Sequence, residues 1–177
     1  HDCEETAALL RTFKGHTGSL NSIAMDDTHI LSGSDDYSMK LWDRESRALL
    51  HSFEGHESSV TAVAMDSSSF FSGGSDNTIK AWSRTNFELE TTIAIDGGTV
   101  YCLAVDASYI VGGTSNCWVN VWDRATYGLL RSCTGHSSYV WSVAIDDASI
   151  LSGSYDRTVK LWNKVSGEEI RTYEGHN

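Results

Sequence analysis

The stretch LSGSDDYSMKLWDR (31–44) recurs three more times at a constant interval, and this repetition decides the fold. Its copies are FSGGSDNTIKAWSR (71–84), VGGTSNCWVNVWDR (111–124) and LSGSYDRTVKLWNK (151–164), which lie forty residues apart along the chain. A period of this size marks a repeat protein, in which one supersecondary unit cannot bury its apolar face alone and packs on its neighbours.

Each unit reads as four short strands. In the first unit we expect strands near 19–25, 29–34, 38–43 and 47–53, with a tight turn at Asp35–Asp36. Small residues such as Ser22 and Ala24 recur in the first strand of every copy, as suits a strand crowded near a central axis. Short β-rich runs at even spacing indicate an all-β fold. We therefore predict a β-propeller of four-stranded antiparallel blades, with the first strand of each blade nearest the axis.

Composition narrows the class of partner and the compartment. The net charge of -11 and the pI near 4.9 argue against nucleic acid and against an anionic membrane surface, since both require a basic face. No apolar run is long enough to span a membrane. The four cysteines show neither metal-ligand spacing nor a dense disulfide framework, which favours free thiols in a reducing compartment. We expect an intracellular protein, cytoplasmic or nuclear, whose natural N-terminus lies upstream of His1.

The Gly-His pairs at 15–16, 55–56, 135–136 and 175–176, together with the Trp endings, resemble the WD-repeat (tryptophan-aspartate repeat) β-propeller family over residues 7–177. This resemblance implies a hydrogen-bonded tetrad of His, Ser or Thr, Asp and Trp within each blade. The matching sets are His16, Ser32, Asp36 and Trp42; His56, Ser72, Asp76 and Trp82; and His136, Ser152, Asp156 and Trp162. The third copy departs from the pattern with Asp96, Gly112, Asn116 and Trp122, so we expect that blade to be held mainly by packing.

The phase of the repeats gives the organisation of the chain. We expect one domain over 1–177, with blades at approximately 17–54, 57–94, 97–134 and 137–174. Residues 6–16 align with the outer strand of a preceding blade, so the chain holds five outer strands but four inner sets. We therefore expect part of a larger propeller, of about seven blades as in most relatives, or half of a two-chain ring. The remaining blades or a second copy would then be its partners.

The residue types of a catalytic triad occur in His16, Ser32 and Asp36. A triad is recognised by geometry and roles, and this combination occurs three times without a G-x-S-x-G nucleophile elbow. The glycine-rich pieces at 72–75 and 111–114 lack the strand–loop–helix context of a phosphate cradle. We predict a protein that is not an enzyme, with no catalytic residue, no cofactor and no metal.

Charged residues repeat at one end of each unit. The acidic set is Asp26, Asp66, Asp106 and Asp146, and the basic set is Arg44, Arg84, Arg124 and Lys164. We interpret them as paired surface charges rather than metal ligands, because a metal site requires carboxylates that converge on one point.

Aromatic residues distinguish the last two copies. In WD-repeat relatives the top face is formed by the turn before the first strand and the turn after the second. There the first two copies carry polar residues, whereas the last two carry Tyr101, Tyr139, Trp141 and Tyr155. Exposed aromatic residues are typical interface anchors. The alternative is that Trp141 or Tyr101 fills a gap toward missing blades or the central channel.

We therefore predict a non-enzymatic protein–protein interaction scaffold that binds a peptide or a partner domain on its top face. The acidic balance favours a partner of basic character. The alternatives are a substrate-receptor propeller of a ubiquitin ligase and the targeting domain of a larger enzyme such as a kinase. A receptor for phosphopeptides would need clustered Arg, yet only Lys14 and Arg157 lie close to the top positions.

Overall fold

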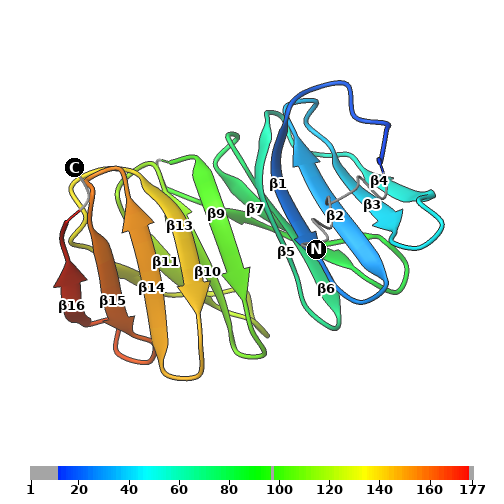
Figure 1. Cartoon of the computed structure of the whole chain (residues 1–177). Coiled ribbons are helices and arrows are strands. Elements are labelled where there is room, and N and C mark those ends of the chain that lie inside the picture. Colours follow the sequence, from blue (N-terminus) through cyan, green and yellow to red (C-terminus); the bar gives the residue numbers. More distant parts are fainter. Residues whose placement is uncertain (1–11, 97, 176–177) are drawn as a thin grey trace, which may run out of the picture.

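The computed structural model describes residues 12–96 and 98–175, and this part of the chain contains sixteen strands, β1 to β16. Consecutive strands form four separate antiparallel sheets of four strands each, which we call blades 1 to 4. Figure 1 shows the blades following one another in a row, with blade 1 and blade 4 at opposite ends. The prediction of an all-β propeller architecture is confirmed.

The strands have the same lengths and positions in every blade, within one residue. Blade 1 contains β1 (Leu20–Met25), β2 (His29–Ser34), β3 (Met39–Asp43) and β4 (Leu49–Phe53). Blade 2 contains β5 (Val60–Met65), β6 (Ser69–Gly74), β7 (Thr78–Ser83) and β8 (Leu89–Ala94). Blade 3 contains β9 (Val100–Val105), β10 (Tyr109–Thr114), β11 (Val119–Asp123) and β12 (Leu129–Cys133). Blade 4 contains β13 (Val140–Ile145), β14 (Ser149–Ser154), β15 (Val159–Asn163) and β16 (Glu169–Tyr173).

The first strands of neighbouring blades lie side by side: β1 contacts β5, β5 contacts β9, and β9 contacts β13. No strong contact of this kind is found between the fourth strands of the described blades, so the sheets converge on their first strands. The small residues of the first strands permit this convergence, because bulky side chains would hold adjacent blades apart.

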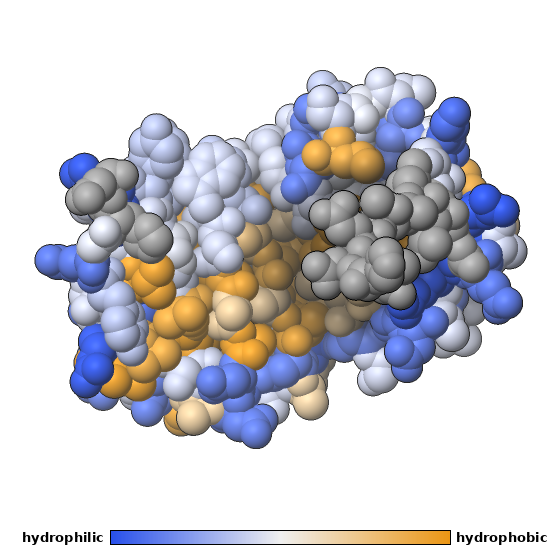
Figure 2. All heavy atoms as spheres, in the orientation of Figure 1, coloured by the Kyte–Doolittle hydropathy of each residue, from blue (hydrophilic) through white to orange (hydrophobic). Residues whose placement is uncertain are grey.

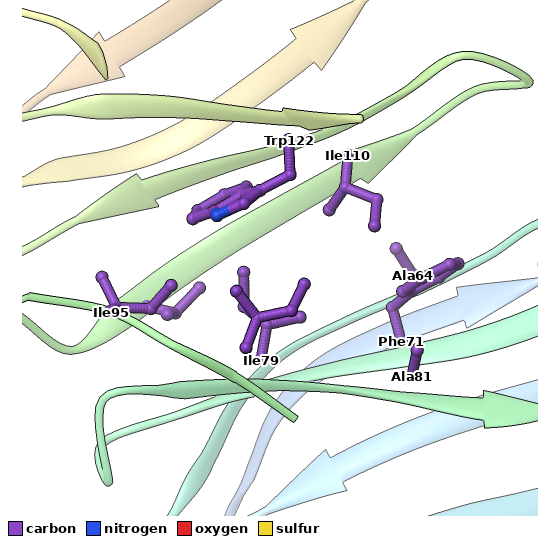
Figure 3. Close-up of a cluster of buried hydrophobic side chains, with 9 residues drawn as sticks. Ala64, Phe71, Ile79, Ala81, Ile95, Ile110 and Trp122 are labelled. Carbon is purple, nitrogen blue, oxygen red and sulfur yellow. The ribbon is translucent and has the colours of Figure 1, made fainter. Parts of the chain in front are cut away.

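The hydrophobic core is divided among the joints between blades. At the joint between blades 2 and 3, Phe71 and Ile79 of blade 2 pack with Ile110 and Trp122 of blade 3, as Figure 3 shows. Equivalent clusters occupy the other two joints. Each buried apolar side chain contributes about 1.5–3 kcal/mol relative to an exposed one. Each blade therefore depends on its neighbours to cover both of its faces.

In blades 1 to 3, a glycine of the second strand packs against a valine of the next blade. A Cβ on Gly33 would lie 2.7 Å from Cγ1 of Val60, and one on Gly73 would lie 2.6 Å from Cγ1 of Val100. Gly153, at the same position in blade 4, meets only its own Ser142 at 3.9 Å, because no blade follows it in the structure. Replacing an internal glycine of this set with a larger residue would force the blades apart.

The two ends of the row expose the side chains that the internal joints bury. Leu20 and Ile23 of blade 1 are 57% and 72% exposed, whereas the equivalent Val60 and Val63 are 0% and 5% exposed. On blade 4, Leu151 is 40% exposed, although the equivalent Leu31 is fully buried. Figure 2 shows apolar side chains gathered over β13–β15. Both terminal faces are thus built like blade–blade joints.

The additional outer strand that we expect at 6–16 lies largely outside the described residues. Its described part, residues 12–16, forms no strand. The blade count of a complete ring remains a prediction.

We expect the 177-residue chain to self-associate through its exposed terminal faces. Ile23→Glu places a charge in the blade 1 face and should reduce association, as measured by sedimentation velocity. Leu89→Glu is the matched control, because Leu89 is 46% exposed but lies on the outer strand of an internal blade. A wild-type chain that sediments as a stable monomer, or an equal effect of both variants, would contradict this prediction.

Candidate protein-binding surface

Three blades contain the same buried hydrogen-bonded set. In blade 4, Nδ1 of His136 lies 2.7 Å from Oδ2 of Asp156, and its Nε2 lies 2.7 Å from Oγ of Ser152. The indole Nε1 of Trp162 donates to the same hydroxyl at 2.8 Å. Because a carboxylate only accepts, Nδ1 carries the ring hydrogen, and the serine hydroxyl can donate to Nε2 while accepting from Trp162. Blades 1 and 2 repeat these bonds at 2.7–2.9 Å.

The aspartates of these sets are held in the ionised form. Burial by itself would raise the pKa of Asp156, but hydrogen bonds from the Thr158 hydroxyl, the Ser137 amide and His136 lower it well below its usual range. The balance is the same for Asp36, where the hydroxyl of Ser38 is the strongest hydrogen-bond donor. Each carboxylate therefore accepts several bonds at once and ties a loop to a turn.

The serines of the sets cannot serve as nucleophiles in this arrangement. Ser32, Ser72 and Ser152 are 4%, 0% and 1% exposed, and each hydroxyl is already engaged by a Trp and a His. A nucleophilic serine must be reachable by a substrate and stand beside a free base. The hydrogen-bonded set of His, Ser, Asp and Trp is therefore structural, and we call it the lock. The described residues also contain no cluster of three or more His, Cys, Asp or Glu suited to a metal ion.

Blade 3 replaces the lock with apolar packing and local hydrogen bonds. Gly112 stands where the serine would be, and a Cβ there would lie 3.0 Å from the Trp122 ring. Nε1 of Trp122 donates to no group among the described residues, and its indole points toward Ile95 (Figure 3). Asn116 turns away to donate to the backbone oxygen of Asp96 at 3.0 Å. The missing serine thus leaves the indole without its acceptor.

Ion pairs connect neighbouring blades at the end of each blade opposite the lock. Arg84 contacts Asp26 at 2.6 Å, Arg124 contacts Asp66 at 2.5 Å, and Lys164 contacts Asp106 at 2.5 Å. Each basic residue comes from the blade that follows the blade of its acidic partner. The sequence indicated that the acidic and basic residues lie at the same end of each blade. That they pair between neighbouring blades is seen only in the structure. Within their own blades, Arg84 donates to the backbone oxygen of Asp66 at 2.7 Å and Lys164 donates to that of Asp146 at 2.8 Å.

The aromatic residues of the last two blades form one group. The rings of Tyr101 and Trp141 stack with centroids 4.1 Å apart, and Tyr101 lies 5.9 Å from Tyr139. The Tyr155 amide donates to the Tyr139 backbone oxygen at 2.9 Å, which joins the two turns of blade 4. Tyr139, Trp141 and Tyr155 are 45%, 49% and 73% exposed, and Tyr101 is half-buried. We call these four residues the aromatic group.

A cavity of about 630 Å³ adjoins the aromatic group on blade 4 and is lined by Trp141, Tyr155 and Arg157. In the earlier blades, the residue equivalent to Trp141 reaches the next blade: Asn21 donates to the Val60 oxygen at 3.2 Å, and Thr61 donates to the Val100 oxygen. Trp141 therefore lies at the open end of the row, beside the face that would meet a following blade.

Four consecutive four-stranded blades, three of which contain this lock, define a segment of a β-propeller. The family model "WD domain, G-beta repeat" matches residues 7–43, 47–83 and 127–163. The chain belongs to the WD-repeat family. The third Trp segment, in which the lock is lost, falls outside the matched residues.

Solved structures agree with this assignment. The crystal structure of the computationally designed Ika8 protein is 30% identical, with a TM-score of 0.85 over 94% of this chain and 52% of that chain. The WD40 β-propeller domain of Doa1 is 28% identical, with a TM-score of 0.82 over 91% of this chain and 55% of that chain. The chain thus spans about half the length of each. A comparison with curated proteins gave no significant match.

WD-repeat propellers generally act as scaffolds for protein interactions and are typically not enzymes. No helix in the described residues is long and apolar enough to cross a membrane.

Asp156→Ala should lower the free energy of unfolding by about 1–3 kcal/mol, because it leaves His136 buried without its acceptor. Asn116→Ala is the matched variant in blade 3 and should cost distinctly less. Denaturant unfolding of both variants, with m-values compared, measures the difference. Equal losses would show that the lock has no special weight in stability.

Proposed function

We propose that this chain binds a protein segment on the top face of the propeller, with Tyr101, Tyr139, Trp141 and Tyr155 as its anchors. The observation that carries the proposal is the stacking of Tyr101 on Trp141 beside two further exposed tyrosines. Aromatic anchors offer large contact areas with few rotatable bonds, so fixing them costs little conformational entropy.

The rest of the repeat supports this role for the aromatic group. The equivalent positions in blades 1 and 2 hold Asn21, Asp35, Thr61 and Ser75, and these blades have the same strands and turns. The fold itself therefore does not require aromatic side chains there. A residue type that the architecture does not need, placed at an exposed position, favours a role in binding.

A partner of basic character suits the charge of the chain. The net charge is -11, and the top turn of blade 1 contributes Asp35, where hydrogen bonds from Asn21 and then Ser59 lower the pKa of the exposed carboxyl. Such a surface attracts cationic segments during diffusional encounter and repels nucleic acid and anionic membranes. We place the protein inside the cell, in the cytoplasm or nucleus, on the basis of its cysteine pattern.

The ring that carries this surface would be completed by remaining propeller blades or by a second copy. Two observations support this: the terminal faces expose side chains that are buried at internal joints, and the matched structures are about twice as long as this chain. Completion would place a further blade beside Trp141 and form the other wall of its cavity.

The test is a selection of basic peptides on the 177-residue chain, followed by calorimetric titration of the selected peptide against variants. Trp141→Ala should weaken binding at least tenfold, about 1.4 kcal/mol, with the unfolding midpoint nearly unchanged. Tyr37→Asn is the control, because Tyr37 is also an exposed top-turn tyrosine, 49% exposed, but stands on blade 1, and asparagine tolerates its φ of 69°.

Unchanged peptide affinity in Trp141→Ala would contradict the proposal. A large stability loss in that variant without a binding loss would assign Trp141 to packing.

A further inference from the structure

Blade 3 contains a second cavity, away from the aromatic group, with a volume of about 260 Å³. It lies between β11 and β12 of blade 3 and residues 93–96, which end blade 2. Its polar lining includes Asp96, Asn120 and Ser132, and its aromatic lining includes Trp118 and Trp122. Protein pockets for whole small molecules usually occupy about 300–1,000 Å³, so this cavity has the size for a single side chain.

The other three blades fill the equivalent space with a lysine of their own third strand. Nζ of Lys40 donates to Ser52 at 2.7 Å, Nζ of Lys80 to Thr92 at 3.1 Å, and Nζ of Lys160 to Thr172 at 2.7 Å. Each lysine pairs in register with the hydroxyl residue that it contacts. Asn120 occupies this position in blade 3 and pairs with Ser132. Blade 3 thus keeps the hydroxyl, in Ser132, but lacks the lysine ammonium that donates to the equivalent hydroxyl in the other three blades.

The shorter asparagine leaves an acceptor without a donor. Asn120 is 4% exposed, and its buried Oδ1 has no hydrogen-bond partner among the described residues. A buried oxygen of this kind costs free energy until a donor reaches it. It is the sole buried side-chain polar atom without a partner in residues 12–96 and 98–175. Asn120 therefore brings a side-chain oxygen without a hydrogen-bond donor to the lining of the cavity.

The remaining lining suits a cation. In blade 4, Nζ of Lys160 lies 6.0 Å from the centroid of Trp162, so that blade places an ammonium near its own third-strand indole. Trp122 is the equivalent ring, and Trp118 adds a second aromatic wall that no other blade has. Asp96 adds negative charge at the exposed rim. Arg124, which donates to the lining residue Tyr127, is also held by Asp66 of blade 2.

We propose that this cavity binds the side-chain ammonium of a lysine from a partner polypeptide, which takes the place held by an internal lysine in the other blades. The ammonium donates to Oδ1 of Asn120 and Oγ of Ser132, while the aliphatic stem lies against Trp122. This site is separate from the aromatic group and does not depend on it.

The experiment follows the indole NMR signals of Trp118 and Trp122 during titration with acetyl-Gly-Lys-Gly-amide. The same peptide with norleucine in place of lysine is the uncharged control, and n-butylammonium tests the ammonium without a polypeptide. We expect the lysine peptide and n-butylammonium to shift both signals at millimolar concentration and the norleucine peptide to leave them unchanged.

Asn120→Lys should abolish these shifts or weaken binding at least tenfold, because it restores the internal lysine that the other three blades contain. It should also raise the unfolding midpoint, which shows that the variant is folded. Ser132→Ala should weaken binding several-fold, and Trp141→Ala should leave it unchanged, which separates this site from the proposed top-face function.

Absence of binding by the lysine peptide, equal binding by the norleucine peptide, or undiminished binding in Asn120→Lys would overturn the proposal. Binding of n-butylammonium without binding of the lysine peptide would overturn the polypeptide source.

Discussion

The structure depends most on an imidazole that is buried between a carboxylate and a hydroxyl. His136 comes from the connection between blades, Ser152 from the second strand, Asp156 from the following turn and Trp162 from the third strand. The set therefore ties the entry of the chain into a blade to the strands that face the preceding blade. The glycine before the histidine makes this possible, since a Cβ on Gly135 would lie 3.2 Å from the Trp162 ring. Blade geometry and blade–blade packing are fixed together.

A repeat array tolerates the loss of this lock in one copy because stability is roughly a sum over units and their joints. Blade 3 keeps its four strands, although Gly112 and Asn116 replace the serine and the aspartate. Its joint with blade 2 is compensated by apolar side chains such as Ile93 and Ile95, which pack with Trp122. Two of the positions that depart from the other blades, Asp96 in place of the histidine and Asn120 in place of the internal lysine, line the small cavity. Departures from the repeat, rather than the repeat itself, mark the two proposed binding sites.

The architecture could be predicted from the sequence, because the repeat of forty residues means that the strands expected in one blade are expected at equivalent positions in all four. The members of the lock followed from the family resemblance, and the weak copy was recognised from Asp96, Gly112 and Asn116. The cross-blade pairing of Arg84 with Asp26 could not be predicted, because it depends on the stacking angle between sheets. The sequence indicated the cavity by a single difference, Asn120 in place of the lysine of the other three copies. Only the structure shows that no neighbouring side chain fills the space left by the shorter residue.

The most direct test of the central claim compares hydrogen exchange at the four equivalent indole N–H groups by NMR. Trp82, Trp122 and Trp162 are 5%, 2% and 1% exposed, so the four side chains are similarly buried, and Trp122 alone lacks the serine acceptor. The indole N–H groups of Trp42, Trp82 and Trp162 should exchange slowly, and that of Trp122 should exchange clearly faster. Protection of Trp122 equal to that of the other three would contradict the claim that the hydrogen-bonded lock, and not packing alone, holds the blades.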